Sequence, residues 1–358
     1  MRFALSEDQK LLQGSIAKAL EQLSPLERVR RFADQAQETA PDLWGGLTEL
    51  GLPGLLIAEE HGGLGLGMVE AAIAAEALGA AVAPAPFLGS AVLAPLALAL
   101  GGSPEQRAEW LPKLAAGDVT AGVAISEAVA GARDGAGVDA VDQKLNGKAL
   151  FALDARGAGL LIVADRQGRL HLVTAAVSQT PMDSIDATRR LTEISFQDTA
   201  AAPLASNHAL DRLRDAAWIV LAAETLGASQ AMLDKAVAYA KERKQFGRVI
   251  GSFQAVKHLC AEMAAELEPA RALVWYAAYA FDQSLPEAPL MAAHAKAHLS
   301  EIGRFVARTA TEVHGGIGMT DLLGLHYWFK RIGQNRQLLG GPERVREIAA
   351  RLQGLTPA

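Results

Sequence analysis

The sequence predicts an α+β fold in which two helical regions flank a region of strands. Residues 1–118 and 205–358 contain Ala/Leu-rich runs whose apolar residues recur at helical spacing. Residues 119–204 instead contain short alternating or β-branched runs, separated by turn-forming clusters such as LNGK and DRQGR. We therefore expect an N-terminal helical domain (1–118), a middle antiparallel β-domain (119–204) and a C-terminal helical domain (205–358) whose long helices run antiparallel.

The N-terminal region carries clear helix signals. Ser6 is placed to cap a first helix, EDQKLLQGSIAKALEQL, and two further helical runs follow, PDLWGGLTELGL and MVEAAIAAEALGA. A glycine-rich segment, IAEEHGGLGLG (57–67), separates these last two runs. Its letters resemble a dinucleotide-binding fingerprint, but the segment does not follow a strand, so we interpret it as a loop of the helical domain.

Composition and charge limit the classes of function that this protein can have. Half of the 358 residues are hydrophobic, which is ample for a core, and the net charge of −6 argues against nucleic acid or an anionic membrane as the main partner. The single cysteine, Cys260, excludes an internal disulfide and suits a reducing compartment. The N-terminus lacks the apolar stretch of a signal peptide, and the most apolar window (91–102) is too short to span a bilayer. We expect a soluble cytoplasmic protein.

A basic segment, RKQFGRVIGSFQ (243–254), interrupts the helical pattern of the C-terminal region. Arg243 suits the C-terminus of the preceding helix, Ser252 is placed to cap the next one, and Phe246 is expected to be buried. The segment is interpretable as a polar connection between helices. A cation, two amide side chains and a new helix N-terminus also suit a pyrophosphate group.

A second glycine-bracketed break, HGGIGMTD (314–321), precedes another helix. Paired glycines let a backbone approach a nucleotide closely, although such a match is weak by itself. His314 and His326 are twelve residues apart without a third ligand at suitable spacing, so we expect no metal site.

RKQFGRVIGSFQAVKHLCAEM, followed at a distance by EVHGGIGMTD, resembles the C-terminal half of the acyl-CoA dehydrogenase family. LWGGLTELGLPGLLIAEEHGGLGLG and EAAIAAEALG resemble its N-terminal helical domain, and LPKLAAGDVTAGVAISE, LNGKA and ISFQDTAAAP its middle β-domain. The resemblance covers nearly the whole chain. It implies a three-domain fold, a non-covalent FAD, an acyl-CoA thioester substrate, and an assembly in which one subunit's RxxFG loop contacts a neighbour's FAD.

The same resemblance implies which residues contact the cofactor. The residues that match the family's contacts to the ADP half of FAD are Arg243, Gln245, Phe246 and Gln254. Gly315 and Gly316 match the diglycine that approaches the same group, and Ser126 retains a hydroxyl beside the flavin.

The catalytic base is where this sequence departs from the family pattern. Dehydrogenation needs a base for the α-proton while the β-hydride goes to the flavin, and a carboxylate in a dry pocket suits that task. The family's usual glutamate position corresponds to Leu339, in RQLLGGPER, and the isovaleryl-type position corresponds to Ala217. Glu224, on the apolar stripe of the same helix as Ala217, is our candidate base. The alternative is that Glu224 pairs with an arginine or lysine of a neighbouring helix or at a subunit contact. Asp321 is better interpreted as a helix-start residue.

Further departures lie on the flavin side. Glu312 stands where a glutamine is common, and a carboxylate would repel a pyrophosphate. The segment over the flavin reads SEAVAGARDG, which lacks the family's Pro and Gly-Ser. Phe151 still suits covering the flavin ring, whereas Leu153 cannot donate a hydrogen bond to it.

The compact chain, with its short C-terminus and HGGIG, resembles subunits of the α2β2 acyl-CoA dehydrogenases of steroid side-chain breakdown, in which two different family members share the FAD sites. The missing base and the departures on the flavin side fit such a role. The resemblance thus implies an oxidoreductase of lipid metabolism that works with a second such subunit and an electron-transfer flavoprotein. Small residues in VAPAPF (82–87) leave room for a bulky acyl group such as a steroid. Two alternatives stay open: a structural partner subunit without a base of its own, and a flavin oxidase on the same fold.

Overall fold

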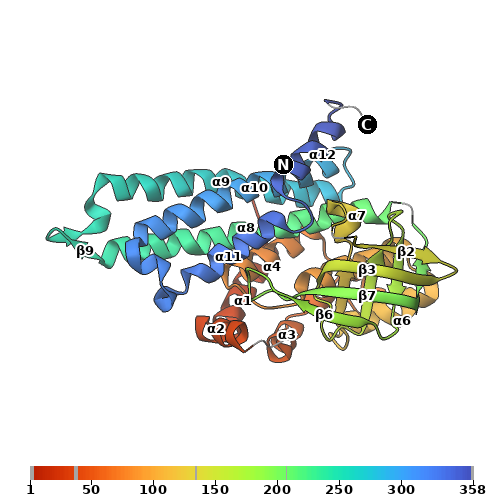
Figure 1. Cartoon of the computed structure of the whole chain (residues 1–358). Helices are drawn as coiled ribbons and strands as arrows, with labels where there is room; N and C mark the ends of the chain where they lie inside the picture. The colour runs from red at the N-terminus through yellow and green to blue at the C-terminus, as the bar shows by residue number, and fades with distance from the viewer. Residues whose placement is uncertain (1–3, 36–38, 134, 207, 356–358) are drawn as a thin grey trace.

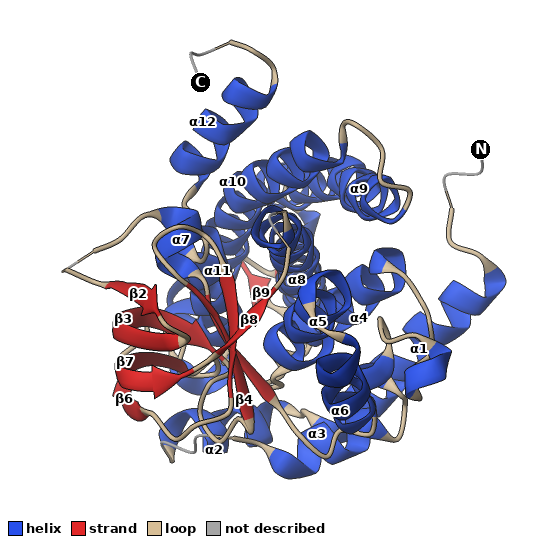
Figure 2. Ribbon diagram, turned by 90° about the vertical axis from the view of Figure 1, so that its right-hand side faces the viewer, coloured by secondary structure: helices blue, strands red, loops and turns tan. Residues whose placement is uncertain are grey.

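The computed structural model describes residues 4–35, 39–133, 135–206 and 208–355. Helices, then strands, then helices follow one another along the chain, which confirms the predicted fold class (Figure 1). Figure 2 shows the strands gathered on one side of the molecule and the helices on the other, with the long helix α8 among the helices.

The N-terminal region is helical, and Ser6 caps its first helix as predicted. The Ser6 hydroxyl accepts a hydrogen bond from the Gln9 backbone N–H (3.1 Å), and the Gln9 side chain accepts one from the Ser6 N–H (2.9 Å). The helices are α1 (Glu7–Leu23), α2 (Leu26–Asp34), α3 (Pro41–Thr48), α4 (Met68–Ala80), α5 (Ala94–Gly101) and α6 (Pro104–Ala115), with short turns η1 (Leu52–Gly54), η2 (Glu59–His61) and η3 (Leu88–Leu93).

The middle region forms one sheet whose path runs β6-β7-β3-β1-β4-β5-β8, with β2 paired to β3. The expectation of a purely antiparallel sheet was wrong, because β1 and β4 are parallel (Ala121 opposite Leu160). The reason is topological: β3 runs antiparallel to β1, and the chain then reverses into β4 on the other side of β1. The strands are β1 (Ala121–Ala124), β2 (Gly137–Val141), β3 (Lys144–Leu153), β4 (Leu160–Ala164), β5 (Leu170–Val173), β6 (Ser178–Met182), β7 (Leu191–Ala200) and β8 (Ala202–Leu204), with helix α7 (Ser126–Ala130) after β1.

The C-terminal region is built on three long helices that lie side by side, as expected (Figure 1). They are α8 (Ala209–Glu242), α9 (Gln254–Asp282) and α10 (Ala288–His314). The shorter elements are β9 (Lys244–Gln245), β10 (Arg248–Val249), η4 (Ile250–Ser252), η5 (Gly315–Met319), η6 (Asp321–Leu323), α11 (Leu325–Gln337) and α12 (Pro342–Leu352).

Helix α8 is the centre of the core. Two glycines let α4 approach it closely: a Cβ at Gly79 would collide with the Glu224 carbonyl, and a Cβ at Gly227 would collide with the Glu76 carbonyl. By length and composition α8 could cross a membrane, but 89% of its most apolar window is buried inside the protein. Its apolar character is therefore explained by packing.

Candidate active site

The segment after α8 forms a two-stranded hairpin at the far end of the helical bundle, where Figure 1 shows β9. Arg248 pairs with Gln245, and the turn between them places Phe246 (φ 52°) and Gly247 (φ 79°) in the left-handed region. The expectation that Phe246 is buried was wrong, since its side chain is 91% exposed. The hairpin tip extends beyond the bundle, and the Phe246 ring meets the edge of the Phe253 ring with 6.2 Å between their centroids.

Ser252 does not cap helix α9, contrary to the sequence expectation. Its hydroxyl donates to the Val249 carbonyl (2.7 Å) within the short turn η4, and Phe253 occupies the N-cap position. Gln254 is therefore the first residue of α9, with an exposed side chain at the base of the hairpin.

The diglycine lies at the same end of the bundle as the hairpin. Helix α10 ends at His314, and the His314 ring stacks on Tyr239 of the last turns of α8, with centroids 4.7 Å apart. Gly315 follows with φ 64°, and a Cβ at either Gly315 or Gly316 would meet no atom within 4 Å. The backbone here is thus open to a ligand, and the structure brings the diglycine together with the Arg243 segment.

Ser126 lies elsewhere, beside a cavity of about 240 Å³ between the β-region and helix α11. Its hydroxyl is 3.4 Å from the Phe151 carbonyl, so the structure brings these two residues together. Since α8 has 34 residues, it is roughly 50 Å long. The predicted cofactor contacts therefore form two groups toward opposite ends of the bundle (Figure 1), one at the hairpin and one at this cavity. We call it the flavin-side cavity, because the family resemblance places Ser126 and Phe151 beside the flavin.

The two positions that the family resemblance assigns to a base, Leu339 and Ala217, are apolar and buried in this structure. Leu339 lines the flavin-side cavity, with φ 55° and 2% of its side chain exposed. The Trp218 indole N–H donates to the Leu339 carbonyl (2.8 Å), and Ala217, which precedes Trp218, is fully buried.

In the described lining of the flavin-side cavity, the carboxylates are Glu127 and Asp183. Burial raises the pKa of Glu127, and its Oε1 accepts the backbone N–H of Leu150 (2.7 Å). Sequence reasoning missed Glu127, although its place directly after a buried strand was the available signal. Its bond to the strand backbone ties it to the fold.

Glu224 is held in a buried network of charged and polar groups. Its Oε1 accepts from Arg189 (2.8 Å) and Arg331 (2.6 Å), and its Oε2 accepts from the Asn335 amide (2.9 Å). Arg331 also donates to Asp186. Burial raises the pKa of Glu224, but the Arg189 and Arg331 guanidinium groups lower it by more, so that the net shift is downward.

These contacts match the alternative in which Glu224 pairs with arginines. Glu224 does not lie among the described residues that line the flavin-side cavity. A carboxylate with a lowered pKa and two guanidinium partners is a weak proton acceptor, so this geometry favours a structural role.

The remaining candidates are surface features. Asp321 begins the turn η6, and its carboxylate lies 3.5 Å from the His326 Nε2. Among the residues that the structure describes, no three His, Cys, Asp or Glu side chains are grouped so that they could hold a metal ion. Cys260 is partly buried on α9.

Comparison with known proteins agrees with this fold. Family models described as the N-terminal and C-terminal domains of acyl-CoA dehydrogenase match residues 6–118 and 209–353. The chain is 33% identical to the acyl-CoA dehydrogenase IpdE2 of Mycolicibacterium smegmatis, over 97% of this chain and 99% of the relative. It is also 33% identical to IpdE2 of Mycobacterium tuberculosis, over 97% of this chain and 96% of the relative.

Two solved structures resemble it over almost their whole lengths. A variant described as the "Tcur3481-Tcur3483 steroid ACAD" superposes with a TM-score of 0.89 at 28% identity, covering 97% of this chain and 98% of that one. A chain of the ChsE4-ChsE5 complex from Mycobacterium tuberculosis superposes with a TM-score of 0.91 at 26% identity, covering 100% of both. The resemblance inferred from the sequence is confirmed: this chain belongs to the acyl-CoA dehydrogenase family.

Proposed function

We propose that this chain acts in the FAD-dependent α,β-dehydrogenation of an acyl-CoA thioester as one subunit of a heteromeric α2β2 enzyme. Two structural relatives support this choice, since one comes from a complex of two differently named chains, ChsE4 and ChsE5, and the other is described as a steroid ACAD. A bulky, steroid-type acyl group is the substrate class that the second of these relatives favours. The proposed electron acceptor is an electron-transfer flavoprotein, and the proposed location is the cytoplasm.

The residues present fit the two halves of FAD. At the hairpin end, Arg243 supplies a cation and the open diglycine Gly315–Gly316 supplies backbone that nothing covers, which together suit an ADP group. At the flavin-side cavity, Ser126 offers a hydroxyl and Phe151 an aromatic face, which suit a ring system. Glu312, exposed at the hairpin end, is an unfavourable charge that a partner's cation would offset.

The observation that carries the proposal is the separation of these two groups toward opposite ends of the α8 bundle. Because the ADP-side residues and the flavin-side cavity of one chain lie so far apart, a single chain cannot surround one FAD molecule with both. A second chain, with its hairpin laid against this chain's flavin-side cavity, would complete one. This is the exchange of RxxFG loops that the family resemblance implies.

Within such a site, the residues of this chain would bind and orient the cofactor and the substrate, and would not themselves take part in proton transfer. Bound FAD would supply the hydride acceptor. Leu339 and Ala217 would keep the α-carbon side dry, which favours removal of the α-proton by a carboxylate elsewhere in the assembly. We propose that the partner supplies that carboxylate. Glu224 is the alternative base from this chain, and its pairing with Arg189 and Arg331 disfavours it.

A structural subunit is the second candidate function, and the arginine pairing of Glu224 is the observation that favours it. In that case the partner alone would carry a complete site, and this chain would only support it.

The deciding experiment measures flavin per chain by absorbance, first for this protein alone and then for the protein co-purified with a second acyl-CoA dehydrogenase-like chain of the same source. The proposal predicts little flavin alone, about one flavin per pair of unlike chains, and bleaching on addition of acyl-CoA. Full flavin and bleaching in this chain alone would refute the shared site. Full flavin and bleaching in the partner alone would assign this chain a structural role.

A further inference from the structure

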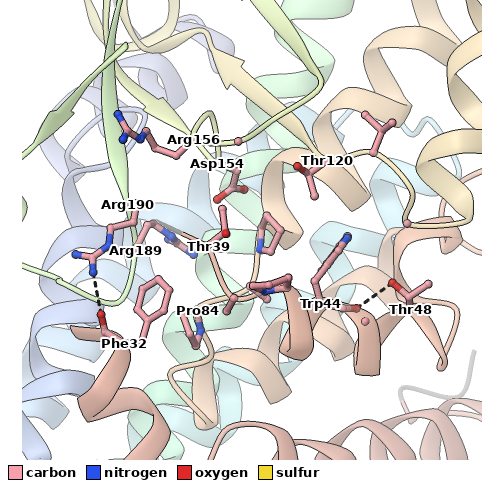
Figure 3. Close-up of a pocket in the computed structure, with 18 of the residues that line it drawn as sticks. Phe32, Thr39, Trp44, Thr48, Pro84, Thr120, Asp154, Arg156, Arg189 and Arg190 are labelled. Carbon is pink, nitrogen blue, oxygen red and sulfur yellow. Dashed lines mark hydrogen bonds between the residues drawn. The ribbon is translucent and has the colours of Figure 1, made fainter. Parts of the chain in front are cut away.

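A second cavity, of about 530 Å³, lies between helix α3, the 84–86 segment and the loops at the edge of the sheet (Figure 3). Among the described residues it shares no lining residue with the flavin-side cavity. Arg189 and Arg331 line its inner side, so the buried Glu224 network stands between the two cavities. The second cavity is therefore a separate space of a size typical for small ligands.

The strongest sign of a ligand in this cavity is an unsatisfied donor. Trp44 lines the cavity and is 6% exposed, yet its indole Nε1 is buried and finds no hydrogen-bond partner within the described residues. Figure 3 shows the indole rising from α3 with its nitrogen directed toward the side of the cavity that carries Thr120. A buried N–H without an acceptor is costly and rare, so an acceptor oxygen brought by a ligand accounts for it.

The rest of the lining indicates the chemistry of that ligand. Phe32, Pro84 and Pro86 give rigid apolar surfaces that suit a ring compound. Asp154 also faces the cavity, with one oxygen accepting the Gly89 backbone N–H (2.8 Å), and a carboxylate there disfavours an anionic ligand.

The arginines of the lining do not reverse that preference. The Arg189 guanidinium is already paired with Glu224 and Asn335. Arg190 donates to the Phe32 carbonyl (2.8 Å) and lies over the Phe32 ring. Figure 3 shows Arg156 directed away from Trp44. Arg189 and Arg190 are thus engaged elsewhere and Arg156 is directed away from Trp44, whereas Asp154 and the hydroxyl of Thr120 lie in the lining, so the cavity favours an uncharged ligand over an anion.

We propose that this second cavity binds an uncharged ring compound whose carbonyl or hydroxyl oxygen accepts the hydrogen bond of Trp44. Pro84, Ala85 and Pro86, which the sequence analysis associated with a bulky acyl group, line this second cavity and not the flavin-side cavity. The proposal goes beyond the proposed function, and binding of an uncharged ring compound can be measured without flavin, partner or acyl-CoA.

The test uses two bicyclic probes of the same skeleton, the ketone 2-tetralone and the hydrocarbon tetralin, titrated calorimetrically into the full-length protein. Both should bind, the ketone more tightly. Trp44→Phe keeps an aromatic ring but removes the donor, so it should weaken 2-tetralone binding about fivefold and leave tetralin binding unchanged. Trp110→Phe, on α6 and outside the lining of this cavity, is the matched control and should change neither affinity.

A second variant tests the location independently. Ala85→Leu places bulk in the cavity lining and should abolish binding of both probes while the protein stays folded by circular dichroism. Absence of 2-tetralone binding to the unmodified protein would overturn the proposal, as would an unchanged ketone affinity in Trp44→Phe. Neither result would bear on flavin content or acyl-CoA bleaching, so failure here is distinguishable from failure of the dehydrogenase proposal.

Discussion

The indole N–H of Trp218 donates a hydrogen bond of 2.8 Å to the carbonyl oxygen of Leu339. This bond joins the core helix α8 to the turn between α11 and α12. Leu339 adopts φ 55°, a conformation that a leucine rarely takes without support from its surroundings. The arrangement therefore fixes an apolar residue at the position where the family resemblance would place a catalytic glutamate.

Trp218→Phe should lower the free energy of unfolding by about 1–3 kcal/mol, because the buried Leu339 carbonyl loses its donor while most of the packing is kept. Guanidinium chloride unfolding followed by far-UV circular dichroism measures the change. Trp275→Phe, at a half-buried position on α9, is the control and should cost less. Equal costs in the two variants would show that the hydrogen bond does not stabilise the turn.

Glu224→Gln should destabilise the protein by about 3–5 kcal/mol, because it leaves two buried guanidinium groups facing a neutral amide. The exposed Glu21→Gln serves as the control and should be nearly neutral. In the assembled flavoprotein, acyl-CoA bleaching per folded molecule should be retained. Loss of bleaching with full flavin content and unchanged acyl-CoA affinity would instead identify Glu224 as the base.

The sequence could predict the order of helices and strands, because helical periodicity and turn clusters are local signals. It could not predict the partners of Glu224, since Arg189 lies 35 residues away and Arg331 lies 107 residues away. On the helix itself Glu224 looked like a lone carboxylate on an apolar stripe. Only tertiary packing brought in the two cations.

Two other differences have similarly physical causes. Phe246 has the apolar side chain of a core residue, but the short strands on either side of it pair as a hairpin, and this hairpin carries the ring away from the bundle. The parallel pairing of β1 with β4 depends on where the chain inserts β3, and no local pattern encodes that choice. Ser6 was predictable because its capping partner is only three residues away.

Asp154 should make stability depend on pH. Burial raises its pKa from 3.8 to about 6, although Arg189 acts in the opposite direction. Between these two values the folded protein binds more protons than the unfolded chain, so this group's contribution to the free energy of unfolding falls as the pH rises from about 4 to about 6.

Asp154→Asn keeps an acceptor for the Gly89 N–H and removes the titration. Relative to the unmodified protein, the variant should therefore gain about 2 kcal/mol between pH 4 and pH 7, a figure reduced because the side chain is partly exposed. Urea unfolding at several pH values gives both curves. Parallel curves would show that Asp154 titrates normally in the folded state.

A Phe246 variant tests most directly whether the hairpin of one chain contacts the FAD of another. Its ring is 91% exposed, so Phe246→Ala should change the free energy of unfolding of the isolated chain by less than about 0.5 kcal/mol. If the hairpin contacts a neighbour's FAD, the same change should weaken flavin binding in the heteromer about tenfold, because an aromatic ring of this size contributes about 1.5–3 kcal/mol when buried.

The control is Leu11→Ala, which removes another exposed apolar side chain, on α1, and should leave the flavin affinity unchanged. Flavin affinity is measured by fluorescence quenching during titration of the deflavinated heteromer. An unchanged affinity in Phe246→Ala, with the heteromer intact by size-exclusion chromatography, would show that this hairpin does not contact a cofactor in a neighbouring chain.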